Sequence, residues 1–501
     1  MTWSGRYDQL FIGGAWVSPT SSEKIAVVSP ATEEVIASVP SSSHEDMNRA
    51  VAAARDAFDR GPWPRLPLED RVAVLERFRA IYALQRETFA ELITSEMGCP
   101  ITLSRTIQAT TPLMVLDTFL EVVREYPFSA IRRSANGAAL VTREPVGVVA
   151  AIVPWNVPQS IIMQKLVPAL LAGCTMVIKP APETPLDAYL LAELLQEAGL
   201  PSGVVNIIPA DREVSESLVT HPGVDKVSFT GSTLAGRRIA SLCGQNLKRV
   251  TLELGGKSAA IILDDADLEM TVESLRFASL RNSGQVCSLK TRLVVSRHRE
   301  QELLERLAAL VASMPVGDPQ DPATQIGPMV SERQRGNIER YIEAGIAEGA
   351  RAVVGGRPRD SALGWYVEPT IFADVRPDMS IAQEEIFGPV LSVIPYVSVE
   401  EAISIANDSI YGLNGAVFTS DLDHGLSVAS KLRTGTVELN GSPAGLRAPM
   451  GGFKASGIGR EAGPEGIDPY VEIRSIGLPS GFATVLEDRA SAVTDRKADV
   501  V

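Results

Sequence analysis

A regular alternation of short apolar runs and helical segments between residues 147 and 253 constrains the fold more than any other feature of the sequence. The apolar runs lie at 148–153, 175–179, 204–208, 227–230 and 250–253. Segments with helical periodicity lie between them, at 159–172, 186–198, 213–219 and 234–242. This alternation predicts an α/β fold in which right-handed crossovers join parallel strands and helices cover both faces of the sheet. Ligands of such sheets bind beyond the carboxyl ends of the strands.

A second alternating series follows and predicts a second α/β unit with its own sheet. Its strands are expected at 259–263, 293–296, 352–354, 391–396, 416–419 and 436–440. Amphipathic helices such as 331–348 lie between these strands. At about 150 residues per domain, the 501 residues suit roughly three domain-sized units.

The first ninety residues are predicted to be mostly helical after a polar entry. Ser43 suits the N-cap of a helix that Gly61-Pro62 would end. Farther along, Asn136-Gly137 lies between two extended arms, which indicates a β-hairpin with a type I′ turn. The polar tail 485–501 is left without assigned structure.

Charge and composition exclude several classes of protein. The chain has 61 acidic and 47 basic residues, a formal net charge of −14, which suits neither a nucleic-acid backbone nor an anionic membrane surface. Its longest apolar stretches, 146–153 and 166–178, are shorter than the ~20 residues that span a bilayer, and its start lacks a signal-peptide pattern. Four cysteines at wide intervals form no disulfide framework or zinc motif. A cytoplasmic protein that binds neither nucleic acid nor membranes is expected.

Cys287 is the candidate nucleophile. It lies between a helical segment and a strand, and Gly284 upstream permits the close backbone approach that a reacting centre needs. A lone cysteine is more often a small buried hydrophobe, so both interpretations stay open. The nearest histidine is His298, which gives a Cys–His hydrolase little local support. The other cysteines have apolar or capping contexts and are assigned structural roles: Cys99, Cys174 and Cys243.

Two polar residues at strand ends are further candidates. Glu253 ends an apolar strand, where a carboxylate is either paired with a cation or functional. Lys257 offers such a cation. Asn156 follows strand 148–153 at the position expected for ligands, and its amide could donate hydrogen bonds to developing negative charge. A loop or N-cap role is the structural alternative for Asn156.

Two more positions suggest cofactor binding. Gly231-Ser232-Thr233 follows strand 227–230 and opens a helix whose amino end favours an anion such as phosphate. A tight turn with a serine cap explains the same residues. Lys179 ends strand 175–179, where it either holds ribose hydroxyls or is solvated.

Taken together, these motifs resemble those of the aldehyde dehydrogenase superfamily, of the non-phosphorylating, hydrolytic type. The resemblance runs from Phe11-Ile12-Gly13-Gly14-Ala15-Trp16 to Pro449-Met450-Gly451-Gly452-Phe453-Lys454-Ala455-Ser456-Gly457. The motifs occur in the order Pro154-Trp155-Asn156, Phe229-Thr230-Gly231-Ser232, Leu252-Glu253-Leu254-Gly255-Gly256-Lys257, Gly284-Gln285-Val286-Cys287 and Glu385-Ile386-Phe387-Gly388-Pro389. Their combination is specific to that family.

The resemblance implies an NAD(P)-dependent oxidation of an aldehyde to the carboxylic acid. Cys287 resembles the nucleophile and Glu253 the general base, while the Asn156 side chain and the Cys287 backbone N–H resemble the oxyanion donors. Lys179 and Glu385 resemble ribose-binding residues, and Ser232 resembles a pyrophosphate contact. The expected cofactor-binding residues are Ile152, Pro154, Trp155, Lys179, Gly231, Ser232, Gly236, Leu254, Glu385 and Phe387.

These residue types suit the implied chemistry. A free thiol has a pKa of about 8.5 and is mostly protonated at neutral pH, so Cys287 must be activated. Its attack on the aldehyde would give a thiohemiacetal, and hydride transfer to the nicotinamide would leave a thioester. Glu253 would then deprotonate the water that hydrolyses the thioester. No step calls for a metal.

Three alternatives stay open. A related enzyme would release the acyl group to coenzyme A instead of water; such relatives generally lack the base, so Glu253 argues against this. A non-catalytic protein that kept the scaffold fits poorly with the intact set of Cys287, Glu253 and Asn156. A cysteine hydrolase would act without a nicotinamide.

The cofactor region departs from the family pattern. Many NAD-preferring relatives have a glutamate three residues after the ribose lysine, where this chain has Pro182. Glu183 is one residue out of register, and Arg212 could meet a phosphate. NAD is the expected cofactor, with NADP as the alternative.

The substrate region is only partly informative. Val157, Ile161 and Gln164 are expected to face an aliphatic, moderately wide channel for the small-molecule aldehyde. Glu438 stands where an aromatic residue is common, which argues against a quaternary ammonium aldehyde.

The resemblance also implies three structural parts. These are a dinucleotide-binding domain of residues 1–124 and 145–255, a catalytic domain of 256–456, and a small β-hairpin oligomerisation arm of 125–144 and 470–484. A strand around 470–476 would join the hairpin. The assembly is expected to be a homodimer or a homotetramer.

Overall fold

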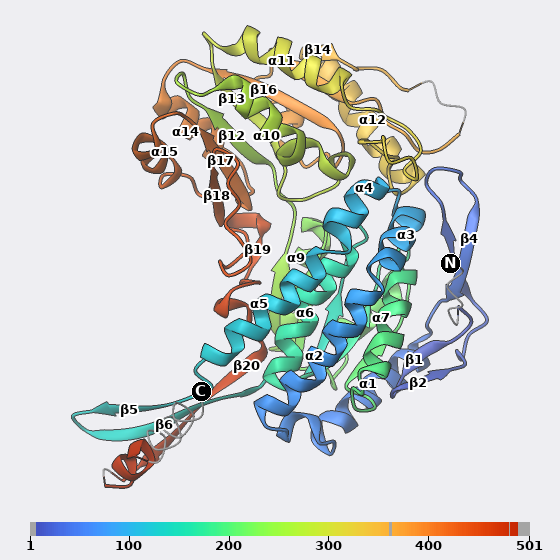
Figure 1. Ribbon diagram of the computed structural model, residues 1–501, viewed down its shortest axis with the longest axis vertical. Coiled ribbons are helices and arrows are strands. Elements are labelled where there is room, and N and C mark those ends of the chain that lie inside the picture. The colour runs from blue at the N-terminus through green and yellow to red at the C-terminus, as the bar shows by residue number, and fades with distance from the viewer. Residues whose placement is uncertain (1–6, 360–362, 480, 489–501) are drawn as a thin grey trace.

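Two large sheets, one above the other in Figure 1, form the framework of the computed structural model, which describes residues 7–359, 363–479 and 481–488. The first sheet has eight strands and the second has seven, and two smaller sheets have three and two strands. Helices pack on both large sheets, so the predicted α/β fold class is confirmed.

The first sheet contains the five strands predicted between residues 147 and 253. They are β7 Val148–Ile152, β8 Thr175–Lys179, β9 Val205–Ile207, β10 Lys226–Thr230 and β11 Arg249–Glu253. They run parallel in the spatial order β11-β10-β7-β8-β9. After β7 the chain adds β8 and β9 on one side of β7, and β10 then pairs with the other side of β7. A ligand crevice is expected where the direction changes, at the carboxyl ends of β7 and β10.

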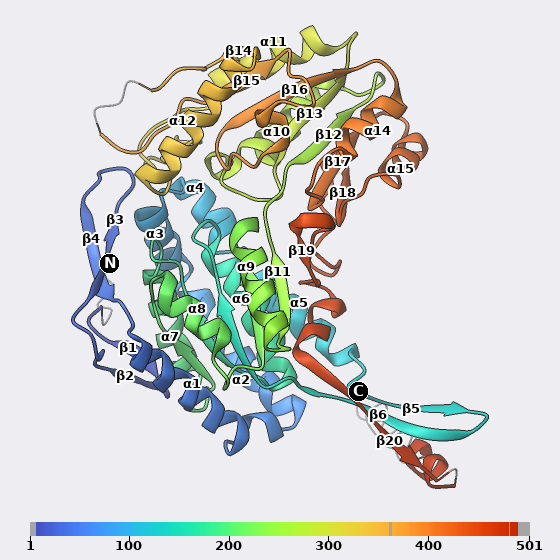
Figure 2. The same ribbon diagram turned by 180° about the vertical axis from the view of Figure 1, so that it is seen from behind.

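Helices cover both faces of the first sheet, as predicted. One face carries α2 Leu68–Leu84, α3 Arg86–Met97, α5 Thr111–Glu125, α6 Pro158–Ala172 and α7 Leu186–Glu197 (Figure 1). The other carries α1 His44–Asp59, α8 Arg212–Thr220 and α9 Thr233–Gln245 (Figure 2). Every residue of α6 is buried, and each large apolar side chain so buried contributes about 1.5–3 kcal/mol. Across the described ranges we find no helix with the length and apolar character that a bilayer crossing requires.

The amino-terminal segment differs from the prediction of a mostly helical region. It forms β1 Leu10–Ile12, β2 Ala15–Val17, β3 Lys24–Val28 and β4 Val35–Pro40 before α1 begins. β1 and β2 extend the first sheet in antiparallel fashion beyond β9. β1 and β2 have three residues each, and β3 and β4 are largely exposed, so none of them shows the buried apolar run that marks the later strands. The predicted Ser43 cap is confirmed, because Ser43 Oγ accepts from the Asp46 N–H and the Asp46 carboxylate accepts from the Ser43 N–H.

The second sheet contains the later predicted strands. Its strands are β12 Ser258–Ile262, β13 Lys290–Ser296, β14 Arg351–Val354, β15 Thr370–Ala373, β16 Val390–Tyr396, β17 Asn414–Phe418 and β18 Thr436–Leu439. Their order is β14-β15-β16-β13-β12-β17-β18, and all but β14 are parallel. Only β15 was not predicted. The helices around this sheet are α10 Leu268–Leu280, α11 Glu300–Ala312, α12 Glu332–Ala347, α13 Ser380–Gln383, α14 Val399–Asn407 and α15 Leu422–Ala429.

A three-stranded sheet projects away from both large sheets (Figures 1 and 2). It consists of β5 Ser129–Ser134, β6 Gly137–Pro145 and β20 Val471–Leu478, in the order β20-β6-β5. The predicted hairpin is present, but the type I′ turn is wrong. Ser134 pairs with Gly137, so the turn residues are Ala135 and Asn136, and neither has a positive φ. Residues 489–501 of the tail lie outside the described residues.

Candidate active site

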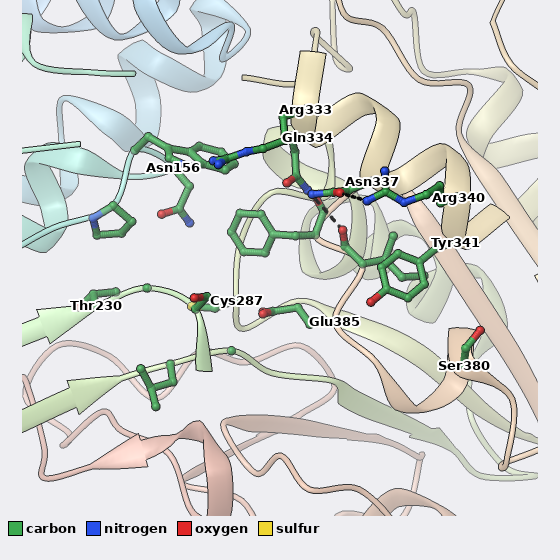
Figure 3. Close-up of a pocket in the computed structure, with 18 of the residues that line it drawn as sticks. Asn156, Thr230, Cys287, Arg333, Gln334, Asn337, Arg340, Tyr341, Ser380 and Glu385 are labelled. Carbon is green, nitrogen blue, oxygen red and sulfur yellow. Dashed lines mark hydrogen bonds between the residues drawn. The ribbon is translucent and has the colours of Figure 1, made fainter. Parts of the chain in front are cut away.

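A cavity of about 650 Å³ opens where the carboxyl ends of β7 and β10 face the second sheet (Figure 3). The predicted catalytic residues Cys287, Glu253 and Asn156 all line it. Seven predicted cofactor-binding residues line it too: Pro154, Trp155, Gly231, Ser232, Leu254, Glu385 and Phe387. The other three predicted cofactor-binding residues are outside its lining: Ile152, Lys179 and Gly236.

Cys287 is positioned by a turn with unusual backbone geometry. α10 runs into a 3₁₀ turn, Arg281–Gly284, in which Asn282 and Ser283 have φ of 53° and 56°. Gly284 has φ of 78°, and a Cβ on it would lie 2.1 Å from the Gly388 carbonyl. Only glycine fits such a contact, as the sequence suggested. Cys287 is partly exposed, whereas the other three cysteines are buried, which agrees with their assigned structural roles.

The environment of Cys287 keeps its sulfur protonated in the resting protein. Burial raises the pKa of the thiol to about 12, and the negative charges of Glu385 and Glu253 add to this effect. The Arg281 guanidinium opposes it. The thiol must therefore lose its proton to a base when it reacts.

Glu253 ends β11 and lines the cavity, and both of its carboxylate oxygens are buried. The residue is 3% exposed, and neither carboxylate oxygen has a hydrogen-bond partner. The Lys257 ammonium group also lacks one, so pairing with Lys257, the structural alternative, is wrong. Burial raises the pKa of Glu253 well above its usual value, and the charge of Glu461 adds to the shift. A carboxyl group with these properties is suited to accept a proton near neutral pH.

Asn156 lies on the opposite side of the cavity and points its carboxamide toward Cys287 (Figure 3). Asn156 Nδ2 donates to the Gln285 carbonyl at 3.0 Å, which leaves its second N–H for another acceptor. The N-cap alternative is wrong: Val157 is the residue before α6, and no side chain caps that helix. An amide N–H directed into the cavity beside a nucleophile can stabilise developing negative charge.

The amino end of α9 opens onto the cavity, where such a helix end is suited to an anion. Ser232 caps the helix by accepting from the Ala235 N–H at 3.3 Å, so the predicted serine cap and the predicted phosphate position coincide. A Cβ on Gly236 would lie 2.4 Å from Leu254 Cδ2. Gly236 therefore allows α9 to pack closely on the segment after β11, although it does not line the cavity itself.

Glu385 lies between the two sheets. Its carboxylate accepts from the Gly256 N–H at 3.0 Å, and burial raises its pKa to about 7. A Cβ on Gly255 would lie 2.2 Å from Glu385 Oε2, so only glycine leaves room for this carboxylate. Beside it, the rings of Trp155 and Phe387 meet edge to face at 5.4 Å and form an apolar wall.

Lys179 ends β8 and is only 8% exposed, so the solvated alternative is wrong. Burial lowers the pKa of Lys179 to about 8, whereas the negative charges of Glu183 and Asp211 act in the opposite direction and raise it. Asp211 caps α8, of which Arg212 is the first residue.

Helix α12 contributes residues that the sequence analysis did not assign to the site. Gln334 donates to the Phe387 carbonyl at 2.9 Å and so holds the segment that carries Glu385. The residues of α12 that line the cavity are Arg333, Gln334, Asn337, Arg340, Tyr341 and Ala344. The spacing of 334, 337, 341 and 344 marks one face of the helix, and this signal could have been found in the sequence.

The predicted substrate residues lie elsewhere. Val157, Ile161 and Gln164 do not line this cavity. Glu438 forms an ion pair with Lys290 at 2.6 Å and accepts from Asn414 Nδ2 at 3.0 Å. In the described part of the chain, no group of three or more His, Cys, Asp or Glu side chains could hold a metal ion.

The fold and the cavity together define a class of enzyme. A helix amino end and two buried carboxyl groups surround a crevice at the point where the strand order of a parallel sheet reverses. These features suit a dinucleotide. A cysteine and a general base face the same crevice, which suits an oxidoreductase that works through a covalent intermediate.

Comparison with known proteins agrees with this class. The model of the aldehyde dehydrogenase family matches residues 16–476. The geranial dehydrogenase of Castellaniella defragrans is 46% identical over 94% of this chain and 99% of its own. The crystal structure of a Mycobacterium tuberculosis aldehyde dehydrogenase complexed with NAD+ has a TM-score of 0.93 and 46% identity, over 95% of this chain and 99% of that one.

A third relative is a mutant of aldehyde dehydrogenase C from Pseudomonas syringae, solved with NAD+ and octanal. It has a TM-score of 0.91 and 41% identity, over 94% of this chain and 96% of that chain. The chain belongs to the aldehyde dehydrogenase family, and it is an NAD(P)-dependent aldehyde dehydrogenase. The coenzyme A-acylating alternative gains no support from these relatives.

The oxidation rate is expected to rise as the pH increases from about 6 to about 9, because Cys287 and Glu253 act deprotonated and burial raises the pKa of both. The measurement is kcat/KM at saturating dinucleotide, with circular dichroism at each pH to confirm folding. Glu253→Gln should remove the part of the rise that this carboxyl causes. A rate that falls with increasing pH while the protein stays folded would contradict this account of the site.

Proposed function

We propose that this enzyme oxidises its aldehyde through a thiohemiacetal and a thioester on Cys287, which water then hydrolyses. The observation that carries the proposal is that Cys287, Glu253 and Asn156 share one cavity with the residues suited to a dinucleotide. Each of these residues has its own role, and the chain divides into the cofactor domain, the catalytic domain and the arm expected from its sequence.

The cavity residues fit a dinucleotide. The α9 amino end with Ser232 would hold the pyrophosphate, and Glu385 and Lys179 would bind the two riboses. Trp155 and Phe387 would keep water from the nicotinamide. When bound, NAD(P)+ supplies a hydride acceptor for the carbon attached to Cys287.

Asn156 and the Cys287 backbone N–H act on the oxygen of the substrate. Glu253 first takes the proton of the Cys287 thiol and gives it up to solvent before the hydrolytic step. As the sulfur forms its bond to the carbonyl carbon, negative charge moves onto that oxygen, and the free Asn156 N–H stabilises it. The same donors act again when water adds to the thioester. Loss of one such donor typically costs about a hundred- to a thousand-fold in rate.

Glu253 acts as the base of the hydrolytic step. Its unpartnered oxygen takes a proton from water, the water oxygen bonds to the thioester carbon, and the C–S bond breaks to release the acid. The raised pKa of Glu253 strengthens it as a base. The absence of a fixed partner leaves the carboxylate available to the water.

Cys287→Ala should abolish aldehyde-dependent NADH formation, a loss of about a thousand-fold or more, because no other group in the cavity is a comparable nucleophile. Absorbance of NADH measures the rate, and titration calorimetry should show unchanged dinucleotide affinity. Cys243→Ala, at a buried cysteine, serves as the matched control and should keep full activity. NADH formation by Cys287→Ala at the normal rate would rule out the proposed nucleophile. Formation of acyl-CoA when coenzyme A is added would rule out the hydrolytic route.

The enzyme prefers NAD to its phosphorylated form, NADP. The charges of Glu183 and Asp211 act on Lys179, and the 2′-phosphate of NADP would bring further negative charge to this region. The M. tuberculosis and P. syringae relatives were both solved with NAD+. Pro182, which replaces the usual acidic residue, is thus compensated by carboxylates from neighbouring positions.

The value of kcat/KM should be about tenfold or more higher with NAD than with NADP, because the negative charges of Glu183 and Asp211 disfavour the 2′-phosphate. Glu183→Gln combined with Asp211→Asn should narrow this ratio by raising kcat/KM for NADP. Glu197→Gln, at an exposed position of α7, is the charge-matched control and should leave the ratio unchanged. A wild-type preference for NADP would refute the assignment.

The substrate is an aliphatic aldehyde of intermediate length. The charge of Glu438 is satisfied by its ion pair with Lys290, so it is not held in reserve for a substrate cation. Relatives named for geranial and solved with octanal support this choice. Octanal is accordingly the first substrate for the assays above.

The enzyme assembles as a homodimer or homotetramer through the projecting three-stranded sheet. Ile473 and Ile476 of β20 are 64% and 42% exposed in the single chain, and such apolar strands are typical of association surfaces. We also propose a cytoplasmic location. All four cysteines are free, which is typical of proteins in a reducing compartment.

Ile473→Arg should shift the protein toward the mass of a single chain, since a charge in an apolar interface is costly to bury. Sedimentation velocity measures the mass. Leu84→Arg, at an α2 residue that is 84% exposed, is the control and should leave the assembly intact. An unchanged mass for Ile473→Arg would argue against this arm as the contact.

A further inference from the structure

The main-chain carbonyl of Asn156 is held by two side chains from distant parts of the sequence. Gln108 Nε2 donates to it at 2.9 Å, and Asn282 Nδ2 donates to it at 3.0 Å. Gln108 is 1% exposed and Asn282 is 2% exposed, so water does not compete for these bonds. The Asn156 side chain is tied separately to Gln285. Hydrogen bonds therefore hold both the main-chain carbonyl and the side chain of Asn156.

Gln108 owes its position to a π-helical turn. Residues Ser104–Gln108 form this turn between α4, Ile101–Leu103, and α5. The Ala109 N–H donates to the Ser104 carbonyl, five residues back, at 2.9 Å, and Thr94 Oγ1 donates to Ser104 Oγ at 2.8 Å. π-turns are rare and occur frequently at functional sites. This turn directs Gln108 toward the loop that follows β7.

Asn282 reaches the same carbonyl from the strained turn before Cys287. Its φ of 53° is in the left-handed region, which asparagine tolerates better than most residues. The Gln285 N–H donates to the Asn282 carbonyl at 3.0 Å, and the Ser283 hydroxyl is held by Gly327. The contacts around the turn therefore maintain a conformation that its own backbone disfavours.

Both amides leave their oxygen atoms without a hydrogen-bond partner. Gln108 Oε1 and Asn282 Oδ1 are buried acceptors with none in the described structure. A buried unpartnered acceptor reduces stability, and it calls for an explanation in each case. That both amides donate to one carbonyl is better explained by a role in positioning Asn156 than by a contribution to the stability of the fold.

We propose that Gln108 and Asn282 are positioning residues that fix Asn156 as the oxyanion donor. The inference rests on the role of Asn156 in the proposed function. With both bonds present, the peptide after Asn156 cannot rotate, so the free N–H keeps its direction into the cavity. With one bond missing, the donor moves, and a shift of about 1 Å in a reacting group can cost about a hundred-fold in rate.

The proposal separates these two residues from the rest of the site. Neither lines the cavity, so neither contacts the dinucleotide or the sulfur. Their loss should affect the steps in which the substrate oxygen becomes negative. It should leave dinucleotide binding and the intrinsic reactivity of Cys287 unchanged.

Gln108→Met tests the proposal directly, because methionine has a similar length and no N–H donor. We expect kcat for octanal to fall about tenfold or more, with the KM for NAD and the rate of Cys287 alkylation by iodoacetamide within about twofold of the wild type. The matched control is Gln159→Met. Gln159 is a fully buried glutamine of α6 whose side chain faces Asp187 and makes no hydrogen bond to the Asn156 peptide, so its variant should keep kcat within about twofold.

A double-mutant cycle with Asn156→Ala distinguishes positioning from a structural role. If Gln108 acts through Asn156, Gln108→Met should change kcat by less than about twofold once Asn156 is alanine. A structural defect would instead reduce kcat by the same factor in both backgrounds. Additive losses, or a kcat of Gln108→Met equal to that of the wild type, would overturn the proposal while leaving the role of Asn156 intact.

Asn282 provides an independent second test if Gln108→Met fails to fold. Asn282→Asp keeps the shape and the left-handed preference but replaces the donor by an acceptor, and Asn282→Gly removes the side chain without strain. Both should lower kcat about tenfold and lose their effect in the Asn156→Ala background. Wild-type kcat in both variants would overturn the proposal. An unchanged kcat for Asn156→Ala alone would overturn the oxyanion role itself, and this inference with it.

Discussion

The connection between the two large sheets is the constraint on which the rest of the molecule depends. β11 ends at Glu253 and β12 begins at Ser258, so four residues carry the chain from one sheet to the other. Gly256 has no room for a side chain, because a Cβ would lie 2.5 Å from the Cys287 carbonyl oxygen, and a Cβ on Gly255 would displace the Glu385 carboxylate, whose Oε2 would lie 2.2 Å away. This close contact places Glu253, Cys287 and Glu385, the proposed base, nucleophile and ribose-binding carboxylate, around one cavity. A longer connection would separate them.

The same closeness determines the electrostatics of the site. Two carboxyl groups and a thiol line one cavity, and burial raises the pKa values of all three. The negative charges of Glu385 and Glu253 raise the pKa of Cys287 further, and the charge of Glu461 does the same for Glu253. The free enzyme thus stores its protons on Cys287 and Glu253. This arrangement protects the sulfur from reaction in the absence of substrate, since the thiolate is the reactive form. It also explains why the carboxylates have no fixed cationic partner, which would lower their pKa values and weaken the base.

The sequence predicts those parts of the fold whose signal is local and repeated. The strands and helices between 147 and 253 alternate regularly, and their predicted bounds differ from the observed ones by only a few residues. β1, β2 and β15 have only three or four residues, and β3 and β4 form a separate, largely exposed two-stranded sheet, so none of them has the longer buried apolar run that marks the predicted strands. The hairpin turn at Ala135 and Asn136 was placed one residue too late, because Asn-Gly favours a type I′ turn that the observed register does not use.

The residues that hold the site in shape were the hardest to predict from the sequence. The three residues proposed as catalytic were recognisable from their motifs. The α12 face was overlooked within a helix that the sequence did predict, and nothing in the sequence marked Gln108 or its π-turn. Asn282, Ser283 and Phe387 all have a positive φ and all lie in the segments that border Cys287 or the cavity. Such conformations are unfavourable locally and persist only because contacts between distant segments maintain them. The geometry of this site is thus a property of the tertiary packing, so its strained positions are where a functional role is best sought.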